Sequence, residues 1–160
     1  MCWLEDWKTL QSFGNQAFRR QQLDLARHYY LHSILQLKSY MSAKLLPLAQ
    51  AEAVAENLVA TKQSAALVQL LICLSISIQN LAETYQHQRR WQRCQMLLRQ
   101  AQQRLQQLQL TLPETHPAQL ILLQESCRLR HEQCRHALDC HRCLQHSSAV
   151  LFEMASTAIH

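Results

Sequence analysis

The sequence predicts an all-α protein, and three observations lead to this fold class. The 160 residues include only one glycine, Gly14, and three prolines, whereas strands need a turn about every eight to twelve residues. Leucine, glutamine, alanine, arginine and glutamate dominate, and these side chains lose little freedom in a helix. Apolar residues also recur at spacings of three and four, which is typical of amphipathic helices. We therefore expect one helical domain spanning residues 1–160.

Helix breakers and polar links divide this domain into about seven helices. Pro47 disfavours helical geometry at the residue before it and suits the first turn of a new helix. Ser64 can cap another helix, and the stretch 111–117, which contains two prolines, is the clearest loop. The expected helices cover residues 3–20, 23–43, 48–60, 64–87, 91–110, 118–130 and 133–158.

Two parts of the chain share one spacing pattern. Relative to Gly14 and to Ala82, a small residue lies 12 positions later, a large apolar one 16 positions later and a small one 19 positions later. The two sets are Gly14, Ala26, Tyr30 and Ser33, and Ala82, Cys94, Leu98 and Ala101. This pattern resembles the tetratricopeptide repeat, in which small residues lie where the two helices of a hairpin touch closely.

The resemblance implies helix hairpins at residues 7–38 and 75–110 and a weaker third copy at 117–150. The third copy carries Leu120, Leu123, Gln124, Cys127, His136, Cys140 and Cys143 at the same offsets. The resemblance also implies that antiparallel hairpins stack into a short right-handed superhelix. Its concave groove, lined by the first helix of each hairpin, would bind another protein. An unrelated helical bundle is the alternative fold.

Polar residues outside the core pattern are the candidate partner-binding residues of this groove. They are Lys8, Gln11, Asn15, Arg19, Asn80, Glu83, Thr84 and His87. Amide side chains such as Asn15 and Asn80 can both donate and accept hydrogen bonds, so they can satisfy the backbone of an extended peptide. The alternative is that each is an ordinary solvated residue. We expect a client protein or peptide as partner, and the formal net charge of +5 favours an acidic one.

Two other functions remain open at this stage. Arg89, Arg90 and Arg93 surround Trp91 at a helix start, an arrangement that can contact phosphates and stack on a base. No known nucleic-acid-binding motif accompanies them. If the chain around residues 127–134 were one continuous helix, Cys127, His131 and Cys134 would share one face. They could then hold zinc with a fourth ligand from elsewhere. A redox sensor is the other function that this cluster could serve. Cysteine is also a common small core residue.

The sequence favours a non-catalytic protein without a cofactor. A single glycine excludes a glycine-rich phosphate loop, and neither a His-Glu-x-x-His helix nor a cluster of carboxylates occurs. The longest apolar stretch, residues 65–78, has 14 residues, whereas a membrane span needs about 20. We therefore predict a buried core helix there and no membrane partner.

Location and assembly can also be predicted. The N-terminus lacks the charge pattern of a secretory signal, and seven cysteines, an odd number, suit a reducing cytoplasm. The size and the three hairpins are similar to the small tetratricopeptide chaperones of bacterial secretion systems. Apolar residues crowd the last helix between Ala149 and Ile159, so we expect that helix to meet a partner or a second copy in a homodimer.

Overall fold

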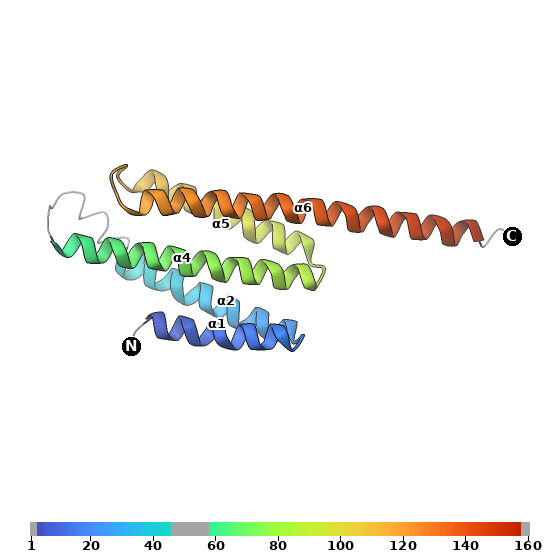
Figure 1. Cartoon of the computed structure of the whole chain (residues 1–160), viewed down its shortest axis with the longest axis horizontal. Coiled ribbons are helices and arrows are strands. Elements are labelled where there is room, and N and C mark those ends of the chain that lie inside the picture. Colours follow the sequence, from blue (N-terminus) through green and yellow to red (C-terminus); the bar gives the residue numbers. More distant parts are fainter. Residues whose placement is uncertain (1–2, 46–57, 158–160) are drawn as a thin grey trace.

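The computed structural model describes the backbone of residues 3–45 and 58–157 and the side chains of 3–43 and 64–141. Within these residues it contains helices and no strand (Figure 1). The elements are α1 (Trp3–Arg19), α2 (Leu23–Tyr40), the π-helical turn η1 (Met41–Leu45), α4 (Leu58–His87), α5 (Trp91–Thr111) and α6 (Ala118–Thr157). The predicted all-α class is confirmed.

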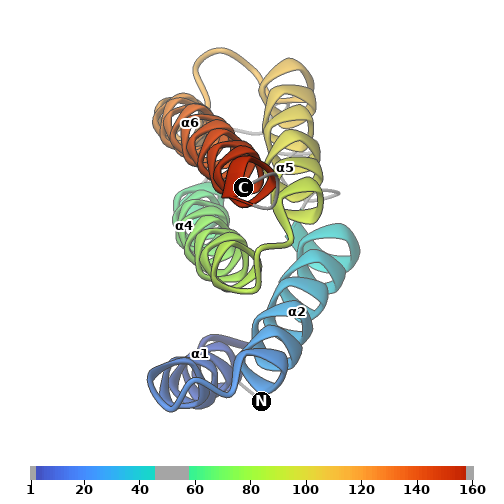
Figure 2. The same ribbon diagram turned by 90° about the vertical axis from the view of Figure 1, so that its right-hand side faces the viewer.

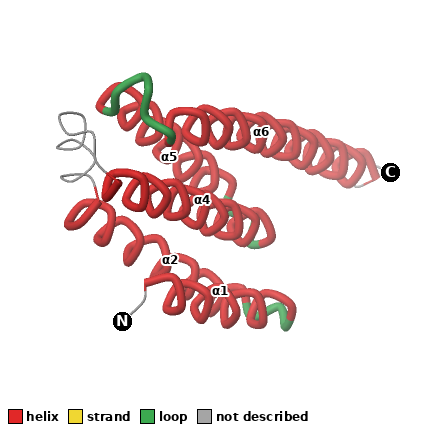
Figure 3. Tube along the Cα trace, turned by 60° about the vertical axis from the view of Figure 1, so that its left-hand side comes forward, coloured by secondary structure: helices red, strands yellow, loops and turns green. Residues whose placement is uncertain are grey.

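The helices pack in the order in which they follow one another along the chain. α1 pairs with α2, α2 packs on α4, and α4 contacts both α5 and α6. Figure 2 shows α4 and α6 side by side, with α2 and α5 following one another along one side of them. Short links join α1 to α2 and α4 to α5, whereas a longer loop leads from α5 to α6 (Figure 3). α4 is therefore the central helix of the described chain.

The hairpins α1–α2 and α4–α5 turn in the same way. Each turn contains one residue in the left-handed region, Gln21 with φ 62° and Arg89 with φ 56°. The amide of the next residue donates to the carbonyl five positions back, Gln22 to Ala17 at 2.9 Å and Arg90 to Tyr85 at 2.8 Å. These hydrogen bonds define a Schellman motif, which satisfies the carbonyls at a helix end. Because Gln21 and Arg89 lie at the same offset in the two repeats, the sequence repeat is also a repeat of backbone geometry.

The small residues of both frames are buried. They are Gly14, Ala26, Ser33, Ala82, Cys94 and Ala101. At Gly14 the fit is closest, because a Cβ atom there would lie 2.5 Å from Cε1 of Tyr30. These six positions are therefore buried, and at Gly14 the close contact is within the hairpin.

The predicted core helix at residues 65–78 is confirmed by burial. Leu67, Leu70, Leu71, Leu74 and Ile78, all in α4, belong to the hydrophobic core. The segment Ser64–His87 is long and apolar enough, by length and composition alone, to cross a membrane, but more than half of its most apolar part is buried inside the protein. Its hydrophobicity is therefore explained by packing against α2, α5 and α6.

The predicted division into seven helices is wrong in the C-terminal part. Residues 118–157 form one helix, because neither glycine nor proline interrupts them and their polar residues are compatible with a helix. The predicted hairpin at 117–150 therefore does not exist, and its apolar markers Leu120 and Leu123 are exposed. α4 begins at Leu58, before the predicted start at Ser64. Most of the helix predicted at 48–60 lies outside the described residues.

Candidate functional site

The predicted partner-binding residues fall into two groups. Lys8, Asn15, Arg19, Glu83 and His87 are exposed, and Asn80 is half-buried. Gln11 and Thr84 are buried, so neither is available to an external partner in this structure. Thr84 donates its hydroxyl hydrogen to the carbonyl of Asn80 one turn earlier in α4. The prediction that Gln11 and Thr84 face an open groove does not agree with this burial.

Gln11 is instead the centre of a buried polar network between α1, α2 and α4. Its Nε2 donates to Oγ of Ser33 at 3.0 Å and to Oγ of Ser77 at 2.8 Å. Its Oε1 accepts from Nδ2 of Asn80 at 2.9 Å. Trp7 adds a hydrogen bond from Nε1 to Oγ of Ser77. Because the amide of Gln11 finds partners on two other helices, its burial is compensated, and the network fixes the first hairpin on α4.

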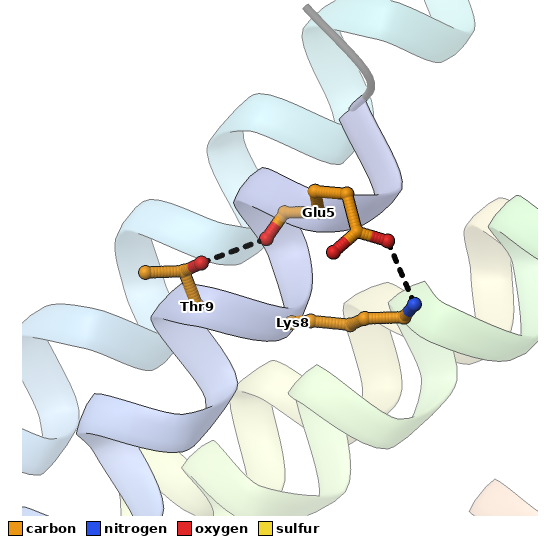
Figure 4. Close-up of polar contacts among 3 residues, drawn as sticks. All are labelled: Glu5, Lys8 and Thr9. Carbon is orange, nitrogen blue, oxygen red and sulfur yellow. Dashed lines mark hydrogen bonds and ion pairs between the residues drawn. The ribbon is translucent and has the colours of Figure 1, made fainter.

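Lys8 and Arg19 are exposed on α1, and Lys8 makes a local contact. Nζ of Lys8 lies 2.8 Å from Oε1 of Glu5, and Thr9 donates to the carbonyl of the same glutamate (Figure 4). Such an exposed ion pair contributes little to stability, about 0–1 kcal/mol. Arg19 is exposed at the end of the helix. A partner can therefore break the Lys8–Glu5 ion pair at low cost.

The remaining exposed candidates lie beside aromatic residues. Oδ1 of Asn15 accepts a hydrogen bond of 2.7 Å from the hydroxyl of Tyr30. Burial, and secondarily the charge of Glu83, raise the pKa of Tyr30 to about 12, so this hydroxyl remains a donor at neutral pH. His87 packs edge-on against Phe18, with ring centroids 5.0 Å apart. The first contact joins α1 to α2 within the first hairpin, and the second joins α1 to α4.

The structure contains a cavity that the sequence analysis did not predict. It has a volume of about 410 Å³ and lies between the end of α2 with η1 on one side and α5 on the other, over α4. Its apolar wall includes Leu71, Leu74 and Ile78 of α4 and Leu105 and Leu108 of α5. These residues repeat at three and four positions, as any packed core does, so no sequence signal separates a cavity wall from a filled core.

The rim of this cavity is polar and positively charged. Lys38 and Arg104 line it together with neutral residues such as Gln100 and Gln107, and no lining residue in the described chain is acidic. Burial, and secondarily the charge of Arg104, lower the pKa of Lys38. The two cations are therefore close enough to repel each other at the edge of an apolar space.

The nearby carboxylate of Glu125 is already engaged. It is buried in α6 and accepts a short hydrogen bond from Oγ of Ser75, which also lines the cavity. Nη1 of Arg128 lies 3.4 Å from its other oxygen. Glu125 therefore fixes α6 to α4, and no ion pair joins it to Lys38 or Arg104 in the described structure.

The metal candidates on α6 do not converge on a site. Cys127, His131 and Cys134 are exposed, and across the described residues no group of three or more His, Cys, Asp or Glu side chains could hold a metal ion. Burial raises the pKa of Cys73, and raises that of Cys94 to about 11. Both thiols therefore stay protonated at neutral pH, which disfavours reactivity.

His136 is a buried imidazole on α6. The residue is 1% exposed, and Nδ1 has no hydrogen-bond partner in the described structure. Burial, followed by the charge of Arg135, lowers its pKa. Leu120, Leu123 and Leu138 lie on the outer face of the same helix and are 62%, 54% and 62% exposed. α6 thus has a tightly buried inner side and exposed leucines on its outer side, and it extends past the ends of α4 and α5 (Figure 1).

The basic cluster at the start of α5 lies at the surface. Arg89 and Arg93 are exposed, whereas Arg90 and Trp91 are half-buried. Comparison with known protein families, with curated proteins and with solved structures finds no match to this chain. Its function must therefore be inferred from the geometry described above.

Proposed function

We propose that this protein is a non-catalytic protein-interaction module, an adaptor or chaperone-like protein of the cytoplasm, that holds a helix or extended peptide of a client. The observation that carries the proposal is the cavity between α2 with η1 and α5. Its volume of about 410 Å³ lies in the range of about 300–1,000 Å³ that ligand sites occupy. Its apolar wall can bury anchor side chains, and its polar rim can orient them.

The repeated hairpins support the same function. The two hairpins have equal turns, and the first, α1–α2, packs against α4 of the second, α4–α5, an arrangement that resembles tetratricopeptide-like repeats. Stacked hairpins leave elongated surfaces along which a peptide can lie. In this proposal the exposed residues Lys8, Asn15, Arg19, Glu83 and His87 form a second area of contact with the client.

A tagged pull-down from native lysate, with and without nuclease, tests this proposal when two tryptophan variants are compared with the unchanged protein. Gln107→Trp places a large side chain at the exposed rim of the cavity, whereas Gln103→Trp changes an exposed residue of the same helix that does not line it. We expect one near-stoichiometric partner with the unchanged protein and with Gln103→Trp, and its loss with Gln107→Trp. Circular dichroism verifies that both variants remain folded.

Two results would contradict the proposal. Equal recovery of the partner by both tryptophan variants would show that the cavity is not the binding site. Recovery that disappears with nuclease would instead support nucleic-acid binding through Arg89, Arg90 and Arg93.

A further inference from the structure

We propose that the client segment is an acidic amphipathic helix, whose apolar face enters the cavity and whose carboxylate lies between Lys38 and Arg104. This inference rests on the proposed function, because it assigns the chemistry of the segment that the cavity holds.

The apolar residues of the cavity wall indicate the apolar part of the ligand. Leu71, Leu74 and Ile78 form a row along α4, and Leu105 and Leu108 continue a row along α5. These apolar side chains line one space from two helices, at helical spacing. A helix whose own apolar residues repeat at three and four positions fits such a space, as in other helix-in-groove complexes.

The charges at the rim determine the polar part. Lys38 comes from α2 and Arg104 from α5, so the fold brings two cations together from distant parts of the chain. Burial first, and then the charge of Arg104, lowers the pKa of Lys38 and so disfavours its charged state. A carboxylate between the two cations would offset their repulsion and accept two charge-assisted hydrogen bonds, one of them from the planar guanidinium of Arg104.

Among the described residues, no carboxylate of the protein occupies the position between Lys38 and Arg104. The cavity has no acidic lining residue in the described chain, and the buried Glu125 is engaged by Ser75 and Arg128. The neutral amides of Gln100 and Gln107 flank the position and can accept or donate hydrogen bonds to polar side chains of the ligand. A basic helix would be repelled at the same place.

Fluorescence anisotropy with two labelled synthetic peptides tests the inference on the full chain. The first probe is an alanine-based helix with three leucines on one face and two glutamates beside them, one turn apart. The second probe has glutamine in place of both glutamates. We expect the acidic probe to bind about tenfold more tightly, and we expect added salt to reduce this difference because the rim is exposed.

Single substitutions locate the effect. Lys38→Gln and Arg104→Gln should each weaken binding of the acidic probe about threefold to fivefold, in line with a partly exposed ion pair, and should leave the glutamine probe unchanged. Arg99→Gln is the matched control, because Arg99 is exposed on α5 but does not line the cavity. It should have no effect on either probe.

The outcomes separate this inference from the proposed function. If both probes bind equally and only Gln107→Trp abolishes their binding, the cavity holds a helix but not an acidic one, and the inference is wrong. If neither probe binds and dodecanoate does, the ligand is a small anionic amphiphile, which overturns the inference. If, in addition, Gln107→Trp leaves recovery of the client unchanged, the proposed function fails as well.

Discussion

Replacing Gly14 by alanine tests the packing that defines the first hairpin. The new Cβ atom would lie 2.5 Å from Cε1 and 2.9 Å from Cδ1 of Tyr30. The ring is 2% exposed and its hydroxyl donates to Asn15, so the ring has little room to move away. Overpacking of this kind costs about 1–3 kcal/mol. Displacing the hydroxyl from Asn15 adds about 1 kcal/mol, and the better helix propensity of alanine returns about 1 kcal/mol. The expected net loss of unfolding free energy is about 1–3 kcal/mol.

The second hairpin shows which change should rescue the variant. Ala82 and Leu98 occupy the positions that correspond to Gly14 and Tyr30, so the larger residue at the first position accompanies a smaller partner at the second. In a Tyr30→Leu background, Gly14→Ala should therefore stabilise the protein by about 1 kcal/mol, the helix-propensity term alone. The sign of the effect should thus reverse between the two backgrounds.

Urea denaturation followed by circular dichroism measures all four members of this double-mutant cycle. The expected coupling between the two positions is about 2–4 kcal/mol, well above the value of about 0.5 kcal/mol within which independent sites add. If Gly14→Ala stabilises the protein in the presence of Tyr30, the ring adapts without cost, and the account of close packing in this hairpin is refuted.

Three further predictions concern the turns, the buried histidine and the terminal helix. Gln21→Gly and Arg89→Gly should each raise the unfolding free energy by about 1 kcal/mol, because glycine adopts a positive φ without strain. Equal urea midpoints for variant and parent would contradict this prediction. Burial keeps the pKa of His136 below its ordinary value of 6.5. Just below pH 6.5 the unfolded chain therefore binds this proton and the folded protein does not. As the pH is lowered there, the unfolding free energy falls by at most about 1.4 kcal/mol per pH unit. The variant His136→Leu should show a smaller difference in urea midpoint between pH 7.5 and 5.5, and an unchanged difference would exclude this histidine as the cause. If a homodimer forms through α6, Leu138→Glu should shift the mass measured by light scattering toward the monomer, whereas a parent protein that is monomeric at high concentration would exclude that assembly.

Local patterns were sufficient for most of the helices. Amphipathic spacing predicted α1, α2 and α5 to within a few residues, and the offsets from Gly14 and Ala82 predicted which small residues are buried. The same local reasoning was wrong for α6, where it predicts two helices, at residues 118–130 and 133–158. Without glycine or proline, polar residues continue a helix, and only a breaker would have ended it.

The sequence by itself determined the all-α class, the two repeated hairpins and the burial of α4, because these depend on spacing within a few turns of one helix. Only the tertiary structure decided that Gln11 is a core residue, since its partner Ser77 lies 66 positions away in the chain. It also decided that Lys38 and Arg104 meet at the rim of an apolar cavity. Both facts arise from helices brought together across the fold, and residues distant in sequence leave no periodic signal of such contacts.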